Sequence, residues 1–148
     1  MRVRVSGVFV QQNEILTMKY TYGGQEVYGI PGGGVDKGIS VIQALHDEWK
    51  EELGVKIEVG NLIMVGEAPG DKRHPQTIHL IFEIKEVFGN PNIRADKTHS
   101  TEIVWLNVEN LKEKNLYPDV GNYLYEYFKK EHKCQLEFVK NCMERGYF

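Results

Sequence analysis

The stretch 31–55 constrains the fold of this chain more than any other part of its 148 residues. It opens with the letters PGGG and continues into a segment with helical periodicity. Ser40 is a good N-cap, Gln43 completes a capping box with it, and Gly54 is a natural stop. We therefore expect a helix over 41–53. The glycine loop before it can approach phosphate oxygens closely and adopt positive φ at several points.

Most of the remaining chain has the pattern of strands. Residues 78–84 alternate apolar with polar side chains, as in a sheet whose two faces differ. A turn at Gln12-Asn13 predicts that the first two strands form a hairpin. The predicted strands cover 3–11, 15–20, 26–30, 56–68, 76–88 and 103–106, and two further helices are predicted at 107–114 and 120–131. This order favours the α+β class, with helices packed on a mixed β-sheet.

Composition excludes several classes of protein. The 18 Lys and Arg residues nearly balance the 21 Asp and Glu residues, so the formal net charge is only −3. A polybasic protein held on nucleic acid by its charge is therefore excluded. No apolar run approaches the roughly 20 residues that cross a bilayer, and the N-terminus lacks a signal-peptide core. We expect one cytoplasmic domain over 1–148, with neither a membrane nor a nucleic acid as partner.

The segment from about 133 to 148 contains both cysteines, Cys134 and Cys142. Two cysteines are too few for a disulfide framework, and no second pair completes a zinc site. The segment also has several large apolar side chains, which is unlike a free tail. We expect this C-terminal extension to pack on the domain or on a second copy of the chain, as a homodimer.

Three glutamates share one stripe of the predicted central helix. Glu48, Glu51 and Glu52 are spaced i, i+3 and i+4, and like charges at that spacing repel. They also lie in the second half of the helix, where the macrodipole disfavours anions. A solvated surface is one interpretation. The other is a site for a hard divalent cation, which prefers clustered carboxylate oxygens. The predicted core face beside this stripe consists of Ile42, Leu45, Trp49 and Leu53.

Residues 33–55 resemble the Nudix box. The family pattern is Gly, five residues, Glu, seven residues, Arg-Glu, an aliphatic residue, any residue, Glu-Glu, any residue, Gly and an aliphatic residue. Gly33 opens it here, and residues 48–55 (EWKEELGV) close it in register. The YGIPGG segment at 28–33 is similar to the lead-in that commonly precedes the box. Glu102, three residues before a tryptophan, is similar to the frequent Glu-x-x-Trp after a later strand.

Two positions depart from the family pattern. Ile39 stands where the family has its first glutamate, and Asp47 stands where it has arginine. In the family these two residues contact each other and link the loop to the helix, so their joint change indicates the loss of one pair. We expect Asp47 to face solvent, with a water-mediated metal contact as the alternative.

The resemblance implies a fold and an activity. The expected fold is a Nudix-type α/β/α sandwich with a mixed β-sheet and a loop-helix-loop. The expected activity is metal-dependent hydrolysis of the diphosphate linkage in a small nucleotide or another nucleoside diphosphate derivative. A diphosphate is densely anionic, so bound Mg²⁺ or Mn²⁺ would screen its charge and activate water. A catalytically weak Nudix-fold nucleotide-binding or regulatory protein is the alternative, because Ile39 and Asp47 depart from the box.

The same resemblance assigns roles to individual residues. The candidate catalytic residues are Glu48, Glu51, Glu52 and Glu102. The candidate metal ligands are the carbonyl of Gly32 and the carboxylates of Glu48, Glu51 and Glu52. Glu48 is either a ligand or the base that takes a proton from water, and Glu102 is a candidate base or further ligand. The candidate substrate-binding residues are Lys19, Gly33 and, on its charge alone, Arg73. For Lys19 and Arg73 the alternative is a solvated surface cation.

Residues that would recognise the organic part of the substrate are harder to choose. The aromatic candidates for stacking on a base are Tyr20, Tyr22, Tyr28, Phe82 and Tyr117. His74, Pro75 and His79 follow a polar turn and either line a pocket or have structural roles.

Overall fold

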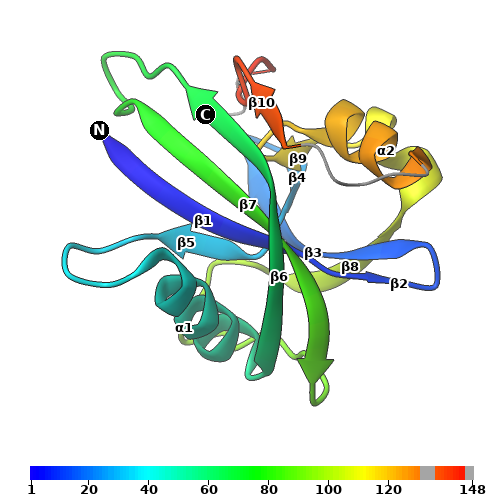
Figure 1. The fold of residues 1–148 in the computed structure, drawn as a ribbon. Helices are drawn as coiled ribbons and strands as arrows, with labels where there is room; N and C mark the ends of the chain where they lie inside the picture. Colours follow the sequence, from blue (N-terminus) through cyan, green and yellow to red (C-terminus); the bar gives the residue numbers. More distant parts are fainter. Residues whose placement is uncertain (131–135, 146–148) are drawn as a thin grey trace.

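The computed structural model of the protein describes residues 1–130 and 136–145. These residues form two five-stranded sheets, shown in Figure 1, one ordered β10-β6-β7-β1-β5 and the other β2-β3-β4-β9 with β8 also paired to β3. The strands are β1 (Arg2–Val8), β2 (Val10–Gln11), β3 (Glu14–Tyr22), β4 (Gln25–Gly29), β5 (Gly32–Gly34), β6 (Lys56–Ala68), β7 (Thr77–Phe88), β8 (Glu102–Asn107), β9 (Leu116–Tyr117) and β10 (Glu137–Val139). The helices are α1 (Val41–Leu53), the 3₁₀ helix η1 (Val108–Glu113) and α2 (Gly121–Lys129).

Both sheets are mixed, which confirms the predicted fold class. In the first sheet β1 runs parallel to β7, whereas β6 is antiparallel to β7. In the second sheet β3 and β4 are antiparallel, whereas β4 and β9 are parallel. The predicted strand 3–11 is divided at Phe9 into two strands with different partners. Strand β1 pairs with β7 and β5, whereas β2 pairs with β3. The predicted hairpin between the first two strands is therefore confirmed only for the last two residues of the first strand, Val10 and Gln11, and for the Gln12-Asn13 turn. In that turn φ is 52° and 63°.

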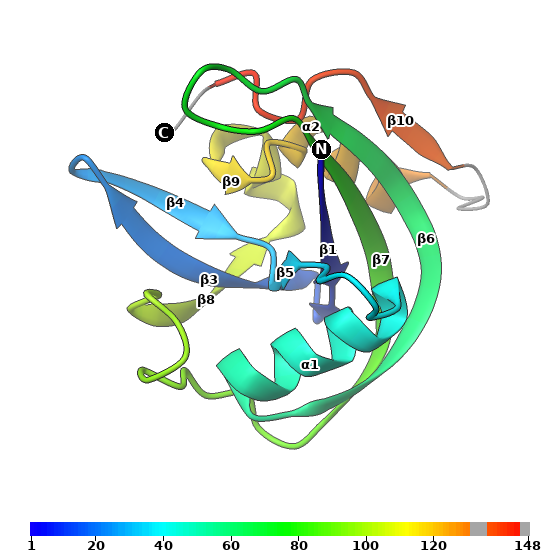
Figure 2. The ribbon, with the colours of Figure 1, turned by 90° about the vertical axis from the view of Figure 1, so that its left-hand side faces the viewer.

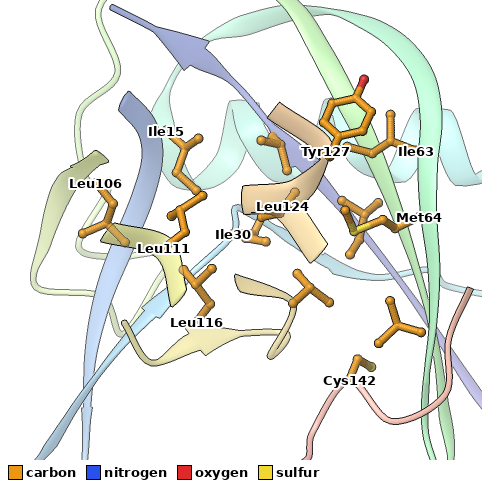
Figure 3. Close-up of a cluster of buried hydrophobic side chains, with 14 of the residues drawn as sticks. Ile15, Ile30, Ile63, Met64, Leu106, Leu111, Leu116, Leu124, Tyr127 and Cys142 are labelled. Carbon is orange, nitrogen blue, oxygen red and sulfur yellow. The ribbon is translucent and has the colours of Figure 1, made fainter. Parts of the chain in front are cut away.

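Two hydrophobic clusters give the molecule its layers. One cluster joins α1 to the first sheet through Leu45, Trp49 and Leu53. The other, drawn in Figure 3, joins the sheets to η1 and α2 and includes Ile15, Leu111 and Leu124. Fully burying a side chain of this size contributes about 1.5–3 kcal/mol. The two helices therefore cover opposite sides of the sheets, as the predicted α/β/α sandwich requires (Figure 1).

Helix α1 has the predicted bounds for local reasons. The Ser40 Oγ accepts a hydrogen bond from the Gln43 N–H at 3.1 Å, and Gly54 ends the helix with φ 69°. The predicted capping box is only half present, because the Gln43 side chain donates to Asp47 at 2.8 Å instead of returning to the cap. The predicted core face is wrong at Ile42, which is 39% exposed, and Ala44 is buried there instead.

The C-terminal segment lies against the domain where it is described. Strand β10 pairs in parallel with β6, and Cys142 is fully buried with its N–H donating to the Glu67 carbonyl at 3.0 Å. Cys134 lies outside the described residues, as does the end of the helix predicted to reach 131. None of the described helices has the length and apolar character needed to cross a bilayer. The predicted homodimer stays a prediction.

Candidate active site

The three glycines before α1 form a strand and not the predicted loop. Gly32–Gly34 is β5, paired antiparallel with β1, and of this region only Gly38 has positive φ, at 88°. We expected positive φ at several points of this glycine segment, and the structure has it at Gly38 but not at Gly32, Gly33 or Gly34. A methyl group on Gly32 would clash with the Val5 carbonyl and lie 2.6 Å from the Ser6 Cα.

Hydrogen bonds hold α1 at a fixed position against β5. The indole N–H of Trp49, which is fully buried, donates to the Pro31 carbonyl at 3.3 Å. At the other end of α1, the Glu52 carbonyl accepts from the Arg94 N–H at 2.9 Å. Carbonyls at the end of a helix lack partners within it, so this bond satisfies one of them. Figure 2 shows the result, with β5 lying directly beside α1.

The fixed contact brings Glu48 against Gly33. A methyl group on Gly33 would lie 2.5 Å from the Glu48 Oε1, so only glycine leaves room for the carboxylate in this position. Glu48 and Glu52, one helical turn apart, are both half-buried and hydrogen-bonded to each other. Glu51 lies beside them on the exposed surface. The structure thus places two of the three helix glutamates together at the edge of the buried face.

The two adjacent carboxyl groups have strongly perturbed proton affinities. Burial raises the pKa of Glu52 to about 8, and the hydrogen bond and negative charge of Glu48 add to the effect. Burial also raises the pKa of Glu48, while the nearby Arg4 guanidinium lowers the pKa of both groups. Two carboxylates in contact cannot both ionise easily. The pair therefore shares a proton, which we place on Glu52.

The carboxyl pair fits a divalent cation. Among the residues that the structure describes, no three His, Cys, Asp or Glu side chains form a group that could hold a metal ion, and Glu48 and Glu52 are the two helix carboxyl groups that contact each other. A hard cation favours carboxylate oxygens and would take the place of the shared proton. The Gly32 carbonyl and the Glu51 carboxylate remain candidates to complete the coordination.

Lys19 and Glu102, which were assigned separate roles, form an ion pair. They are opposite each other in the register of β3 and β8, and the Lys19 Nζ lies 2.6 Å from the Glu102 Oε1. A second carboxylate, that of Glu26, is 3.5 Å from the same Nζ. The hydrogen bond to Glu102 raises the pKa of Lys19. The ammonium group is thus already neutralised by two carboxylates.

A cavity of about 220 Å³ opens at the ends of β6 and β7. Its lining includes Arg2, Pro69, His74, Pro75, His79 and Tyr117. The three residues that the sequence left between pocket and structural roles therefore all line it. Arg73, the remaining cationic candidate, is exposed on the loop between the two strands, and its N–H donates to the Asp71 carboxylate at 2.7 Å.

Arg4 is the charged residue that the sequence predictions missed. It is half-buried in β1, where its Nη2 donates to the Ile30 carbonyl at 3.0 Å. Its guanidinium lies over the Tyr117 ring, 4.7 Å from the centroid. A signal was present in the sequence, since an arginine flanked by valines in a predicted core strand is costly to bury without a partner.

Comparison with known proteins gives this arrangement a family. The sequence matches the family model described as NUDIX domain over residues 1–127. The chain belongs to the Nudix family. As a Nudix member it is a hydrolase that acts on pyrophosphate bonds, and Nudix hydrolases generally use divalent metal ions and small nucleotide derivatives. A search of curated proteins finds no match.

Solved structures share the Nudix fold at low sequence identity. The E. coli ORF135 protein is 20% identical, with a TM-score of 0.72 over 86% of this chain and 89% of that one. A MutT NUDIX hydrolase from Burkholderia pseudomallei is 23% identical, with a TM-score of 0.64 over 73% and 84%. An ADP-ribose pyrophosphatase from Streptococcus suis is 17% identical, with a TM-score of 0.62 over 93% and 98%. These likenesses establish the fold.

The two departures from the Nudix box do not interact with each other in this structure. Ile39 is 43% exposed, and the half-buried Asp47 accepts the hydrogen bond from Gln43 one turn earlier. The expectation that Asp47 faces solvent is thus only partly right. In place of the missing Nudix pair, Asp47 has a contact within α1, and the Trp49 indole supplies a hydrogen bond from the helix to Pro31 at the start of the glycine segment.

The carboxyl pair predicts that stability depends on pH and metal. Glu52 has a pKa of about 8 in the folded chain against a usual value of 4.5. Between these values the unfolded chain has lost a proton that the folded chain keeps, so the free energy of unfolding falls as pH rises. Because Glu52 is partly exposed, we expect a loss of about 1–2 kcal/mol, or roughly 3–6 °C in Tm.

Mg²⁺ should offset this loss, because we expect it to bind the ionised pair. Differential scanning fluorimetry in EDTA and in Mg²⁺ at pH 5 and pH 8 measures the effect, and we expect a larger Mg²⁺ shift at pH 8. The Glu52→Gln variant should lose most of the pH dependence in EDTA. An equal Mg²⁺ shift at both pH values in the unmodified chain would contradict the assignment of the shared proton.

Proposed function

We propose that this protein catalyses metal-dependent hydrolysis of the diphosphate linkage in a small nucleoside diphosphate derivative, with Mg²⁺ or Mn²⁺ as cofactor. The observation that carries the proposal is the pair of half-buried carboxyl groups of Glu48 and Glu52, with Glu48 held against Gly33 and Arg4 nearby. The pair combines a preformed anionic site for the cation with a nearby positive group for the phosphate. A surface patch of glutamates would be fully solvated, with no carboxylate held against a glycine of the neighbouring strand.

Each residue then has a role that its position supports. The carboxylates of Glu48 and Glu52 hold the cation, and Glu51 and the Gly32 carbonyl are adjacent ligand candidates. Bound Mg²⁺ or Mn²⁺ supplies screening of the diphosphate charge and a lowered pKa for water. Glu48 is our choice for the base, through the carboxylate oxygen that does not bind the cation, because Lys19 already occupies Glu102 at 2.6 Å.

The cavity lined by His79 and Tyr117 is our candidate site for the organic half of the substrate. Its volume of about 220 Å³ and its aromatic and histidine lining suit a ring held by stacking and a few hydrogen bonds. Small soluble nucleotides are favoured over nucleic acid because the chain has a net charge of −3. Arg73 and the loop around it would border the entrance. A cytoplasmic location belongs to the same proposal.

A substrate panel tests the proposed function directly. Purified protein is incubated with nucleoside triphosphates, ADP-ribose, nucleotide sugars and dinucleoside polyphosphates, each with Mg²⁺, with Mn²⁺ and with EDTA. We expect cleavage of at least one compound to a nucleoside monophosphate and a phosphorylated remainder, detected by chromatography, and none in EDTA. The alternative, a Nudix-fold binding protein weakened at Ile39 and Asp47, would bind a panel member by calorimetry without cleaving it. Failure to cleave any compound with either metal would overturn the hydrolase proposal.

A further inference from the structure

Three buried polar atoms without a hydrogen-bond partner lie on one face of two neighbouring strands. Among the described residues these atoms are the Arg4 Nη1, the Ser6 Oγ and the His79 Nδ1. Arg4 and Ser6 are two positions apart in β1, so their side chains share a face. His79 is opposite Arg4 in β7 and extends that face across the sheet. Ser6 and His79 are each only 1% exposed.

Unpartnered polar groups at this depth are costly to the fold. Leaving a buried donor or acceptor without a partner costs about 1–3 kcal/mol, and more for a charged group. Three such atoms on one face therefore need partners that the described residues do not supply, such as an ordered water or a ligand. The Arg4 Nη2 already donates to the Ile30 carbonyl at 3.0 Å. The flat face of the guanidinium lies over the Tyr117 ring, 4.7 Å from its centroid. These contacts hold the guanidinium in place while Nη1 remains free to donate.

The position of Arg4 connects the two parts of the candidate site. Its charge acts on the Glu48 and Glu52 carboxyls on one side and on the His79 imidazole on the other. Tyr117, on which the guanidinium lies, also lines the cavity and packs edge-on against His79, with ring centroids 5.6 Å apart. A ligand that extends from the carboxyl pair to the cavity would therefore pass Arg4.

We propose that Arg4 binds a phosphate oxygen of the substrate and places the diphosphate between the carboxyl pair and the cavity, with Ser6 and His79 as hydrogen-bonding partners on the same face. This inference rests on the proposed function. A guanidinium suits the role because it stays charged and presents several donors in a fixed plane. Burial lowers the pKa of His79 to about 3, so its ring is neutral and adds no second charge.

Variants of Arg4 test the inference by binding as well as by turnover. The probe is α,β-methylene-ADP, which resists cleavage at its diphosphate, and its Kd is measured by calorimetry in Mg²⁺. Loss of a charged hydrogen bond should weaken binding about tenfold or more in Arg4→Gln. Arg4→Lys keeps the charge and should fall between Arg4→Gln and the unmodified chain. Lys85→Met, which removes an exposed cation from β7 of the same sheet, should leave Kd unchanged.

The outcomes separate a ligand role from a structural one. If Arg4 only supports the Ile30 carbonyl and Tyr117, Arg4→Gln will lower Tm but leave the probe Kd and the KM within about twofold of the unmodified chain. That result would overturn the inference, as would failure of the unmodified chain to bind the probe. If Arg4→Gln does not fold, Arg4→Lys decides by the same Kd. Probe binding that depends on Arg4, in a chain that cleaves nothing in the panel, would support this inference and overturn only the proposed hydrolysis.

Discussion

Replacing Glu52 by glutamine is expected to lower kcat/KM by about a thousandfold, which corresponds to roughly 4 kcal/mol of transition-state stabilisation. Glutamine has nearly the same shape and can still hydrogen-bond to Glu48, so the helix and its packing should survive. What is lost is one of the two carboxylates that converge beside Gly33. Steady-state kinetics on the substrate identified by the panel measures the fall in kcat/KM. A Mg²⁺ titration of the activity measures how the loss of one carboxylate changes the Mg²⁺ requirement.

The same substitution should stabilise the metal-free protein at pH 8. Glutamine removes the ionisation that burial opposes at this position. The expected pattern is therefore opposite in sign for activity and for stability in EDTA, which a general folding defect cannot produce. Glu58→Gln, an exposed glutamate in β6, is the matched control and should change neither. Activity of Glu52→Gln within tenfold of the unmodified chain would show that the carboxyl pair is not the metal site.

Local signals in the sequence predict the central part of the structure well. The helix 41–53 has the predicted first and last residues, because its cap and its terminal glycine act through neighbouring backbone groups. The strands at 56–68 and 77–88 agree to within one residue, since their apolar patterns are long. The glycine and glutamate spacing was sufficient to identify the family, which the match over residues 1–127 shows.

The parts that could not be predicted depend on contacts between distant segments. Gly32–Gly34 forms a strand because it pairs with β1, and the hydrophobic periodicity of the sequence does not predict that pairing. Lys19 and Glu102 are far apart in the sequence. They form an ion pair only because the register of β3 and β8 places them opposite each other. The valines on either side of Arg4 indicate that it is buried, but its contacts with Ile30 and Tyr117 depend on distant segments and could not be predicted.

Alanine at three consecutive glycines should give three different results. Gly32→Ala forces a methyl group onto the Val5 carbonyl and the Ser6 Cα, which are backbone atoms of the adjacent strand, so we expect a loss of about 3 kcal/mol or more in the free energy of unfolding. Gly33→Ala meets only the end of the flexible Glu48 side chain. We expect it to fold with a Tm close to that of the unmodified chain but to lose about 10- to 100-fold in kcat/KM, because the displaced carboxylate leaves the proposed metal site.

Gly34→Ala is the matched control for this series. Its methyl group would find only the Arg2 Nη2, at 3.7 Å, so stability should change by no more than about 0.5 kcal/mol and activity should stay the same. Urea unfolding and kinetics on the same three proteins separate the two effects. If Gly33→Ala lost stability and activity in the same proportion as Gly32→Ala, the glycine segment would act only as packing. Loss of activity without loss of stability at Gly33 alone requires that the position of the Glu48 carboxylate matters to the chemistry.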